Sequence, residues 1–317
     1  MKKLLIIGTG SIGERHTRCF LATGRVQVSI CEPNDTLRER IARDYTVEAA
    51  FPDLDSALEK DWDAALVATP AHTHIPIAQQ LADKGIHLFI EKPLSTSLDG
   101  IGDLQKTVVD QQLLAAVAYV WRCFPGIEWL KSVVEDRRFG ALKQLTILSG
   151  QNFPFYRPAY REIYYTDRAK GGGAIQDCLT HLLNFSEFLA GPITRIVADS
   201  DHQVLEGVEV EDTVHVIARH GETMGCYSLN QYQAPNETTV TLVFEKGTAR
   251  FEHHENRCRW MTEPGAAWND VELPAMERDD LFIRQANAFL DALEGKSEPL
   301  CTLDEALGTL KATLEIL

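Results

Sequence analysis

The chain opens with KKLLIIGTGSIG at residues 2–13, an apolar run that leads into glycines spaced as G-x-G-x-x-G. Gly8 permits a tight turn, Gly10 lets the backbone approach a pyrophosphate, and Gly13 lets the next helix pack close to the strand. The motif alone is also compatible with a glycine-rich turn of no catalytic use. With a strand before it and helical spacing after it, the motif predicts a dinucleotide site formed by Gly8, Gly10, Ser11, Ile12 and Gly13.

The acid that ends the next apolar strand predicts which dinucleotide binds. Residues 26–31 are apolar in character, and Glu32 follows them, about 20 residues past the glycines. A carboxylate there accepts hydrogen bonds from the ribose hydroxyls of NAD and repels the 2'-phosphate of NADP. We therefore expect NAD, with NADP less favoured. The alternative is that Glu32 is a solvated acid ahead of the turn residues 33–35.

Composition excludes several classes of partner. The 317 residues carry a formal net charge of -15, which disfavours nucleic acid and anionic membranes as partners. No apolar run reaches the length of about 18 residues that a membrane span needs, and no secretory pattern begins the sequence, so we expect a cytoplasmic protein. The seven cysteines form no C-x-x-C and no His/Cys cluster with zinc spacing. They predict reduced, mostly buried thiols and no metal site.

The order of elements predicts an α/β chain with two domains. The first domain, residues 1–122, is expected to contain a doubly wound parallel sheet, because helical segments separate strands near 3–7, 26–31, 63–68, 86–90 and 114–119. The second, residues 123–317, is expected to be an α+β domain. It has a mostly antiparallel sheet of strands near 142–150, 193–199, 212–219, 223–231, 238–244 and 248–252.

Helices are expected within and after that sheet. The patterns predict helices near 126–137 and 174–190 and two more at the end of the chain. The last of these begins with a capping box of Thr302 and Glu305. Whether this last helix packs back on the first domain is left open.

Two loops of the first domain follow strands at their carboxyl ends, where open parallel sheets bind ligands. After the strand near 63–68, Thr69 and Pro70 would line the nicotinamide side, although they equally suit a simple turn. His72 and His74 are better explained as turn or capping histidines than as catalysts.

The second loop is Glu91-Lys92-Pro93, after the strand near 86–90. Lys92 would hold a substrate oxygen and stabilise its developing negative charge. The alternative is a surface Glu-Lys pair before a loop proline. A cis bond before Pro93 is an open possibility.

A third candidate lies in the second domain, where Gly171-Gly172-Gly173 precede a helix. The glycines allow close backbone approach to a ligand, and Asp177, His181 and Asn184 recur on one helical face. Histidine is the natural general base near neutral pH, and a carboxylate one turn away can orient it. The alternative is that these polar side chains form a solvent-exposed face of the helix. The apolar residues around them disfavour it, because they indicate a largely buried helix in which polar groups need partners.

Aromatic and arginine side chains concentrate just before these glycines, at residues 153–165. Aromatic faces pack on sugar rings, and Arg157 or Arg161 would bind a carboxylate or hydroxyls. The same residue types also form oligomer contacts. Arg122, at the domain junction, is a weaker candidate for the substrate pocket.

Four motifs in this order resemble the glucose-fructose oxidoreductase and inositol dehydrogenase family, written Gfo/Idh/MocA. They are the opening glycines, Thr69-Pro70 with His74, Glu91-Lys92-Pro93, and the glycine-led Asp177 and His181. The resemblance covers essentially the whole chain and implies a Rossmann domain followed by a domain with a large open sheet, residues 123–317, that binds substrate and mediates oligomerisation. It departs from the family pattern at Leu179 and Asn184, where glycine and aspartate are usual. These departures concern substrate identity more than hydride chemistry.

The resemblance also implies residue roles. Lys92, Asp177 and His181 become the catalytic set. The residue pattern itself, not the resemblance, adds Arg122 and Arg157 to these three as the expected substrate-binding set. The cofactor set adds Glu32, Thr69, Pro70, His74, Glu91 and Lys92 to the glycine turn.

The function expected is hydride transfer between nicotinamide and a secondary alcohol or ketone of a sugar, cyclic polyol or sugar derivative, by a homodimer or homotetramer. Two alternatives remain open. One is a net non-redox enzyme, an epimerase or glycosidase, that recycles bound NAD. The other is a non-catalytic nucleotide sensor.

Overall fold

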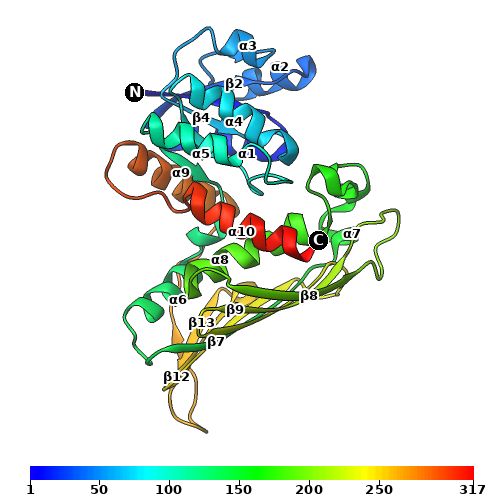
Figure 1. Ribbon diagram of the computed structural model, residues 1–317, viewed down its shortest axis with the longest axis vertical. Helices are drawn as coiled ribbons and strands as arrows, with labels where there is room; N and C mark the ends of the chain where they lie inside the picture. Colours follow the sequence, from blue (N-terminus) through cyan, green and yellow to red (C-terminus); the bar gives the residue numbers. More distant parts are fainter. The chain divides into compact units, whose positions relative to one another are not determined.

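The computed structural model describes residues 1–317, which form two compact units (Figure 1). Unit 1 contains Met1–Val120 and Met276–Ala306, and unit 2 contains Trp121–Ala275 and Leu307–Leu317. The predicted single boundary after residue 122 placed residues 276–306 in the second domain. Packing instead places this segment with the first unit.

Unit 1 is built on a six-stranded parallel sheet in the order β3-β2-β1-β4-β5-β6. This confirms the predicted doubly wound sheet. Its strands are β1 (Lys2–Ile7), β2 (Val26–Cys31), β3 (Ala50–Phe51), β4 (Ala64–Val67), β5 (His87–Ile90) and β6 (Ala115–Val117). Its helices are α1 (Ser11–Ala22), α2 (Asp35–Asp44), α3 (Leu54–Ala57), α4 (His74–Asp83), α5 (Ile101–Asp110) and α9 (Arg278–Leu293).

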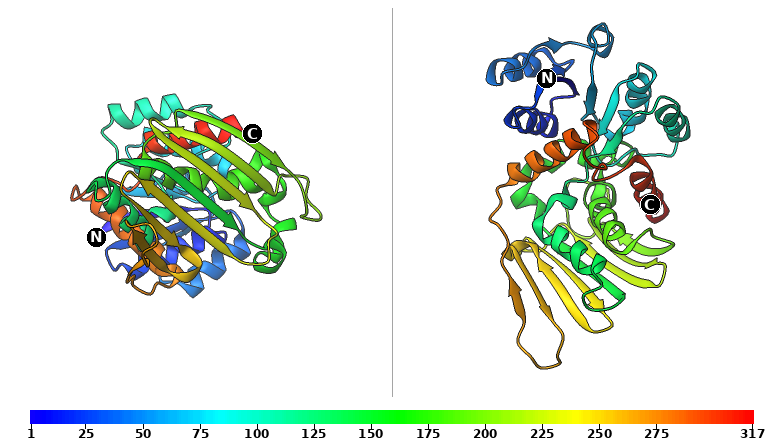
Figure 2. Two further views of the ribbon diagram at one scale, coloured as in Figure 1. Left: turned by 90° about the horizontal axis from the view of Figure 1, so that it is seen from below. Right: turned by 90° about the vertical axis from the view of Figure 1, so that its left-hand side faces the viewer.

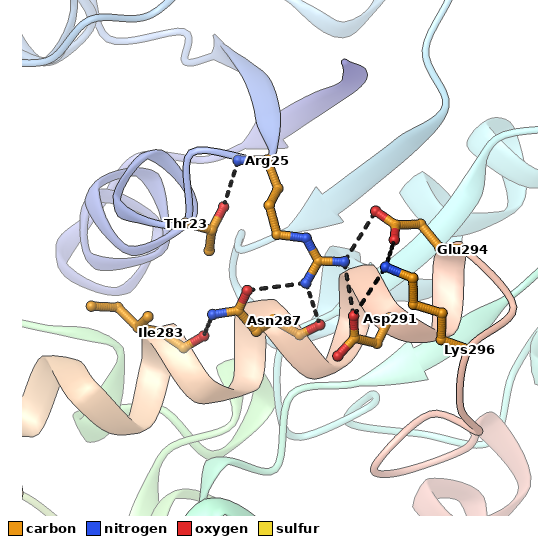
Figure 3. A network of polar contacts seen from close by, with 7 residues as sticks. All are labelled: Thr23, Arg25, Ile283, Asn287, Asp291, Glu294 and Lys296. Atoms are coloured by element: carbon orange, nitrogen blue, oxygen red, sulfur yellow. Dashed lines mark hydrogen bonds and ion pairs between the residues drawn. The ribbon is translucent and has the colours of Figure 1, made fainter.

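The distant segment 276–306 completes the core of unit 1. In α9, the ring of Phe289 stacks on that of Phe89 with centroids 4.6 Å apart, and both side chains are buried. At the surface, the Arg25 guanidinium donates to Asn287 Oδ1 at 3.0 Å and to Asp291 Oδ1 at 2.8 Å, as Figure 3 shows. Glu294 also pairs with Arg25, at 3.0 Å. Apolar stacking and this charged network therefore hold α9 to the strands and helices that precede it by most of the chain.

Unit 2 is built on an eight-stranded sheet in the order β14-β13-β12-β11-β7-β10-β9-β8. Every neighbouring pair is antiparallel except β7 and β10, which are parallel. The predicted strands are all present, and β13 and β14 add to them. The strands are β7 (Leu142–Gly150), β8 (Arg195–Asp201), β9 (Thr213–His220), β10 (Thr223–Asn230), β11 (Glu237–Phe244), β12 (Gly247–Glu252), β13 (Arg257–Met261) and β14 (Asn269–Val271).

One face of this sheet carries the core of unit 2. Side chains alternate between buried and accessible along β9, β10 and β11, as expected for a sheet covered on one face. The buried side packs on helices α6 (Pro125–Glu135) and α8 (Thr180–Ala190). No helix covers the opposite face, as Figure 2 shows. There Val197, Ile217 and Cys226 lie side by side on β8, β9 and β10, and all three are exposed.

Shorter elements connect these layers. They are α7 (Phe153–Tyr156), a π-helical turn η6 (Ile175–Leu179) and 3-10 turns η1 (Ala71–Thr73), η2 (Val120–Cys123), η3 (Pro158–Arg161), η4 (Tyr164–Thr166), η5 (Arg168–Lys170) and η7 (His253–Glu255). The last helix, α10 (Leu303–Ile316), begins with the predicted capping box, because Thr302 and Glu305 exchange hydrogen bonds. None of the helices has both the length and the apolar character needed to span a bilayer.

Candidate active site

The glycine turn joins β1 to α1 and leaves room for a diphosphate. Gly8 has a φ of +83°, and a Cβ there would lie 2.8 Å from the Ala68 carbonyl oxygen. A Cβ on Gly13 would lie 2.0 Å from the Gly8 carbonyl oxygen, so only glycine lets α1 begin this close to the turn. Gly10 faces open space, and no side chain caps the helix that it precedes. The first amides of α1 are thus available to an anion, which fits a dinucleotide diphosphate.

Glu32 lies at the end of β2 and holds the glycine turn directly. Its Oε2 accepts from the Thr9 amide at 2.8 Å and from the Thr9 hydroxyl at 3.1 Å, and its Oε1 accepts from the Asn34 amide at 3.0 Å. The side chain is 7% exposed, so the alternative of a solvated acid is wrong. Each carboxylate oxygen has two lone pairs, which leaves acceptor capacity for ribose hydroxyls.

The loop after β4 is anchored by a buried histidine. His74, the first residue of α4, has its Nε2 2.8 Å from the Thr69 carbonyl oxygen and its Nδ1 2.9 Å from the Pro93 carbonyl oxygen. The residue is 1% exposed, and burial lowers its pKa. Its ring thus contacts two loops of the protein, whereas Thr69 and Pro70 are the accessible part of this loop. His72 is exposed, as a turn histidine would be.

The loop after β5 begins with a buried carboxylate. Glu91 Oε1 lies 2.6 Å from His16 Nε2, and its Oε2 accepts from the Lys92 amide at 2.9 Å. Glu91 is 5% exposed, so the alternative of a surface Glu-Lys pair is wrong. The Lys92–Pro93 bond is cis. Because β1 pairs in parallel with β4, and β4 with β5, this loop, the Thr69 loop and the glycine turn follow the same edge of the sheet.

In unit 2, the predicted catalytic carboxylate lies in the π-helical turn. Asp177 is 2% exposed and accepts from Arg157 Nη1 at 3.0 Å and from the Tyr164 hydroxyl at 2.8 Å. The charge of Asp177 raises the pKa of both partners. Single π turns inside helices are frequent at functional sites. The cluster adds Tyr164 to the residues named from sequence, where it was one of several aromatic side chains in a row.

The prediction that Asp177, His181 and Asn184 lie on one helical face is wrong for Asn184. The π turn ends at Leu179 and α8 begins at Thr180, so the spacing of an α-helix does not hold across these residues. Asn184 is buried, where its Oδ1 accepts from Arg122 Nε at 2.8 Å and its Nδ2 donates to Thr309 at 3.0 Å. His181 lies in the first turn of α8 and is half-buried.

Arg122 does not fit the expected substrate pocket. Its side chain is 1% exposed, hydrogen bonds to Asn184 and lies over the Phe188 ring, 4.8 Å from the centroid. A guanidinium this enclosed serves packing, and we do not include it in the proposed site.

Close packing within the protein explains why glycines precede the π turn. A Cβ on Gly172 would lie 2.3 Å from the Tyr165 carbonyl oxygen, and one on Gly173 would lie 2.4 Å from Glu211 Oε1. Glu211 is buried, accepts from the Ile175 amide at 3.0 Å and pairs with Arg168 at 2.6 Å. The expectation that the glycines allow a ligand to approach is therefore replaced by close packing against the protein itself.

No group of three or more His, Cys, Asp or Glu side chains is arranged to hold a metal ion. All seven cysteines are free, and five of them are buried. Burial raises the pKa of the Cys19 thiol to about 11 and that of Cys258 to about 12, which keeps both protonated and unreactive.

Comparison with known proteins agrees with this geometry. Residues 2–119 match the model described as an oxidoreductase family with an NAD-binding Rossmann fold, and residues 127–250 match the C-terminal domain model of the same family. A levoglucosan dehydrogenase of Pseudarthrobacter phenanthrenivorans is 25% identical over 203 residues, which are 61% of this chain and 52% of that protein. The chain thus matches about half the length of that relative.

Two further similarities extend over the whole chain. The rhizopine catabolism protein MocA of Rhizobium meliloti is 25% identical over 315 residues, 97% of this chain and 92% of that protein. A structure of levoglucosan dehydrogenase with NADH and levoglucosan superposes with a TM-score of 0.89 at 19% identity, and covers 99% of this chain and 96% of the other. NAD is therefore the cofactor of this chain, whose residues 2–119 form the NAD-binding domain, and the chain belongs to the Gfo/Idh/MocA family of oxidoreductases.

Proposed function

We propose that this protein transfers a hydride between NAD and a secondary alcohol or ketone of a sugar, cyclic polyol or sugar derivative. The observation that carries the proposal is the edge of the sheet in unit 1, where the glycine turn, the Thr69 loop and the segment Glu91-Lys92-Pro93 follow neighbouring strands. Open α/β sheets bind ligands at this edge. The substrate class rests on the family and on the levoglucosan dehydrogenase among its relatives.

The proposed chemistry assigns one task to each side chain. In the oxidation direction, His181 accepts the hydroxyl proton, the carbon–oxygen double bond forms, and the hydride leaves the carbon. The Lys92 ammonium stabilises the negative charge that develops on the oxygen. Asp177 binds a substrate hydroxyl and keeps Arg157 beside it, since the two side chains are 3.0 Å apart. Bound NAD supplies the hydride acceptor.

Glu32 supports a preference for NAD over NADP. Its buried carboxylate is fixed by Thr9 and Asn34 at the point where a ribose would sit, and a second negative charge there would be repelled.

The decisive experiment is a panel of sugars, inositols and sugar acids, each assayed with NAD and with NADP by nicotinamide absorbance. We expect NADH to accumulate with at least one member. Lys92→Met should lower kcat at least a hundredfold, as the loss of an oxyanion partner does, while Lys106→Met, a surface change on α5, should leave it unchanged. Full turnover by Lys92→Met would refute the assignment of the lysine. Substrate consumption without NADH accumulation would favour the non-redox alternative.

We also propose that the protein is a cytoplasmic homodimer or homotetramer. The uncovered face of the eight-stranded sheet supports an oligomer, because exposed apolar side chains such as Leu148, Val197 and Ile217 lie on it. Seven free thiols and an NAD cofactor suit a reducing compartment.

A further inference from the structure

The two residues that flank Lys92, Glu91 and Pro93, each make a buried contact with a histidine. The Glu91 carboxylate faces His16 through Oε1 and the Lys92 amide through Oε2, at 2.6 and 2.9 Å. The Pro93 carbonyl oxygen lies 2.9 Å from His74 Nδ1. Both histidines are at most 1% exposed, and neither belongs to the catalytic set proposed above.

His16 has no other polar contact to explain its place in the core. Its ring lies among Phe20, Phe89 and Phe282, with centroids 5.4 to 6.3 Å away. Its Nδ1 is buried without a hydrogen-bond partner. An unpartnered buried polar atom costs stability, which an apolar side chain at this position would avoid. The contact that offsets this cost is the one to Glu91.

The hydrogen on His16 follows from its partner. A carboxylate only accepts hydrogen bonds, so Nε2 of His16 donates to Oε1 of Glu91. A link therefore runs from His16 on α1, through the Glu91 side chain, to the main-chain amide of Lys92. Because α1 is also the helix that begins at the glycine turn, one rigid element contributes both to the cofactor cradle and to the placement of Lys92.

His74 provides a second link from the other side. Its ring lies between the carbonyl oxygens of Pro93 and Thr69, in the loops after β5 and β4. Because a carbonyl oxygen only accepts, a neutral ring donates to one of the two, and we take the bond to Pro93 as the one that matters for Lys92. Lys92 thus lies between two residues that are held independently, one through its side chain and the other through its carbonyl.

We propose that His16 and His74 are positioning residues that fix the main chain at Lys92, the first through Glu91 and the second through Pro93. The catalytic consequence rests on the proposed function of Lys92, whereas the effect on the main chain does not. Positioning of this kind matters because a displaced catalytic group loses much of its effect.

Asparagine and glutamine distinguish this proposal from a general packing role. The amide nitrogen of glutamine reaches about as far as histidine Nε2, and that of asparagine about as far as Nδ1. Since Glu91 is contacted by Nε2 and Pro93 by Nδ1, His16→Gln and His74→Asn should keep the proposed contacts. His16→Asn and His74→Gln should lose them. A packing role would not give opposite preferences at the two positions.

The primary measurement is hydrogen exchange of the Lys92 amide in the ligand-free protein. We expect exchange about tenfold faster in His16→Asn and His74→Gln, as for the loss of one hydrogen bond, and little change in His16→Gln and His74→Asn. The exposed His72→Asn and His72→Gln serve as matched controls. Equal exchange within both pairs of variants would overturn the proposal.

Turnover gives the second measurement. With an active substrate, kcat should fall in the two contact-losing variants about as much as exchange rises, while NAD affinity from titration stays within a few-fold. If Lys92→Met keeps full turnover, the proposed function of Lys92 fails, yet the exchange pattern still decides the positioning proposal. Should His16→Asn not fold, Glu91→Gln replaces it. Faster exchange at Lys92 in that variant supports the link, and unchanged exchange overturns it.

Discussion

At the scale of single residues, Glu32 is the side chain on which cofactor choice depends. We predict that Glu32→Gln weakens NAD binding about tenfold and narrows the preference over NADP, because a neutral amide accepts hydroxyls less strongly and does not repel a phosphate. Its amide oxygen can still accept from the Thr9 amide, so the turn should persist. Titration of both dinucleotides measures the effect, with the exposed Glu39→Gln as control. Unchanged affinities for both would contradict the prediction.

Burial of His253 predicts how the stability of unit 2 changes as the pH falls. Burial lowers its pKa from 6.5 to about 4, where it lies among Trp121, Phe124 and Phe251. The unfolded chain therefore takes up the proton first as the pH falls below 6.5, and stability is lost until about pH 4. At pH 5 the low pKa of His253 reduces the free energy of unfolding by about 2 kcal/mol.

Urea unfolding at pH 7 and pH 5 tests this predicted loss of stability on acidification. His253→Gln should lose less stability on acidification than the parent chain does, while the exposed His72→Gln should lose as much as the parent. An equal loss in His253→Gln and the parent chain would show that burial of this ring does not govern the acid response.

At the scale of elements, the close packing of the glycines before the π turn predicts how much stability a substitution there costs. Gly173→Ala should cost about 1–3 kcal/mol, because φ is +90° and the new Cβ would meet the Glu211 carboxylate. Gly191→Ala is the matched control, since φ is +88° but nothing lies within 4 Å. Chemical denaturation measures both, and equal losses would mean that backbone strain alone, without the carboxylate, sets the cost.

The elements also show what the sequence could predict. The β1–α1–β2 unit followed from its glycine spacing and apolar runs, which are local features. β3 is two residues long and has no periodicity to detect. The π turn shifts the face of the helix after Asp177, and an assumed α-helical spacing therefore placed Asn184 wrongly.

Tertiary contacts account for the remaining differences. The parallel pairing of β7 with β10 joins strands far apart in sequence. The bonds of Glu91 to His16 and of Glu32 to Thr9 are likewise long-range, so the pattern that placed both acids at strand ends did not show that they are buried. Residue types at strand ends were thus predictable, and their partners were not.

At the scale of the whole molecule, the uncovered sheet face predicts how copies associate. If it forms the contact in the proposed oligomer, Ile217→Lys should shift the mass in light scattering from a dimer or tetramer to a monomer, because a buried unpaired charge is costly. Val109→Lys, at an exposed apolar position on α5, should leave the mass unchanged. Cys226, in the same row as Ile217, should react with thiol reagents faster in the variant. An unchanged mass for Ile217→Lys would place the contact elsewhere.

The return of residues 276–306 to unit 1 has a consequence for biosynthesis. A ribosome delivers β1 to β6 first, then Trp121–Ala275 of unit 2, and only afterwards the helix whose Phe289 and Asp291 complete the first core. Until then the nascent Rossmann half lacks the part of its hydrophobic interior that α9 supplies. Unit 2 is completed later still, because Leu307–Leu317 follow α9 and bring Thr309 to the buried Asn184. Both cores are therefore finished only when the last helices have been synthesised, so truncation near the C-terminus should impair the two units together.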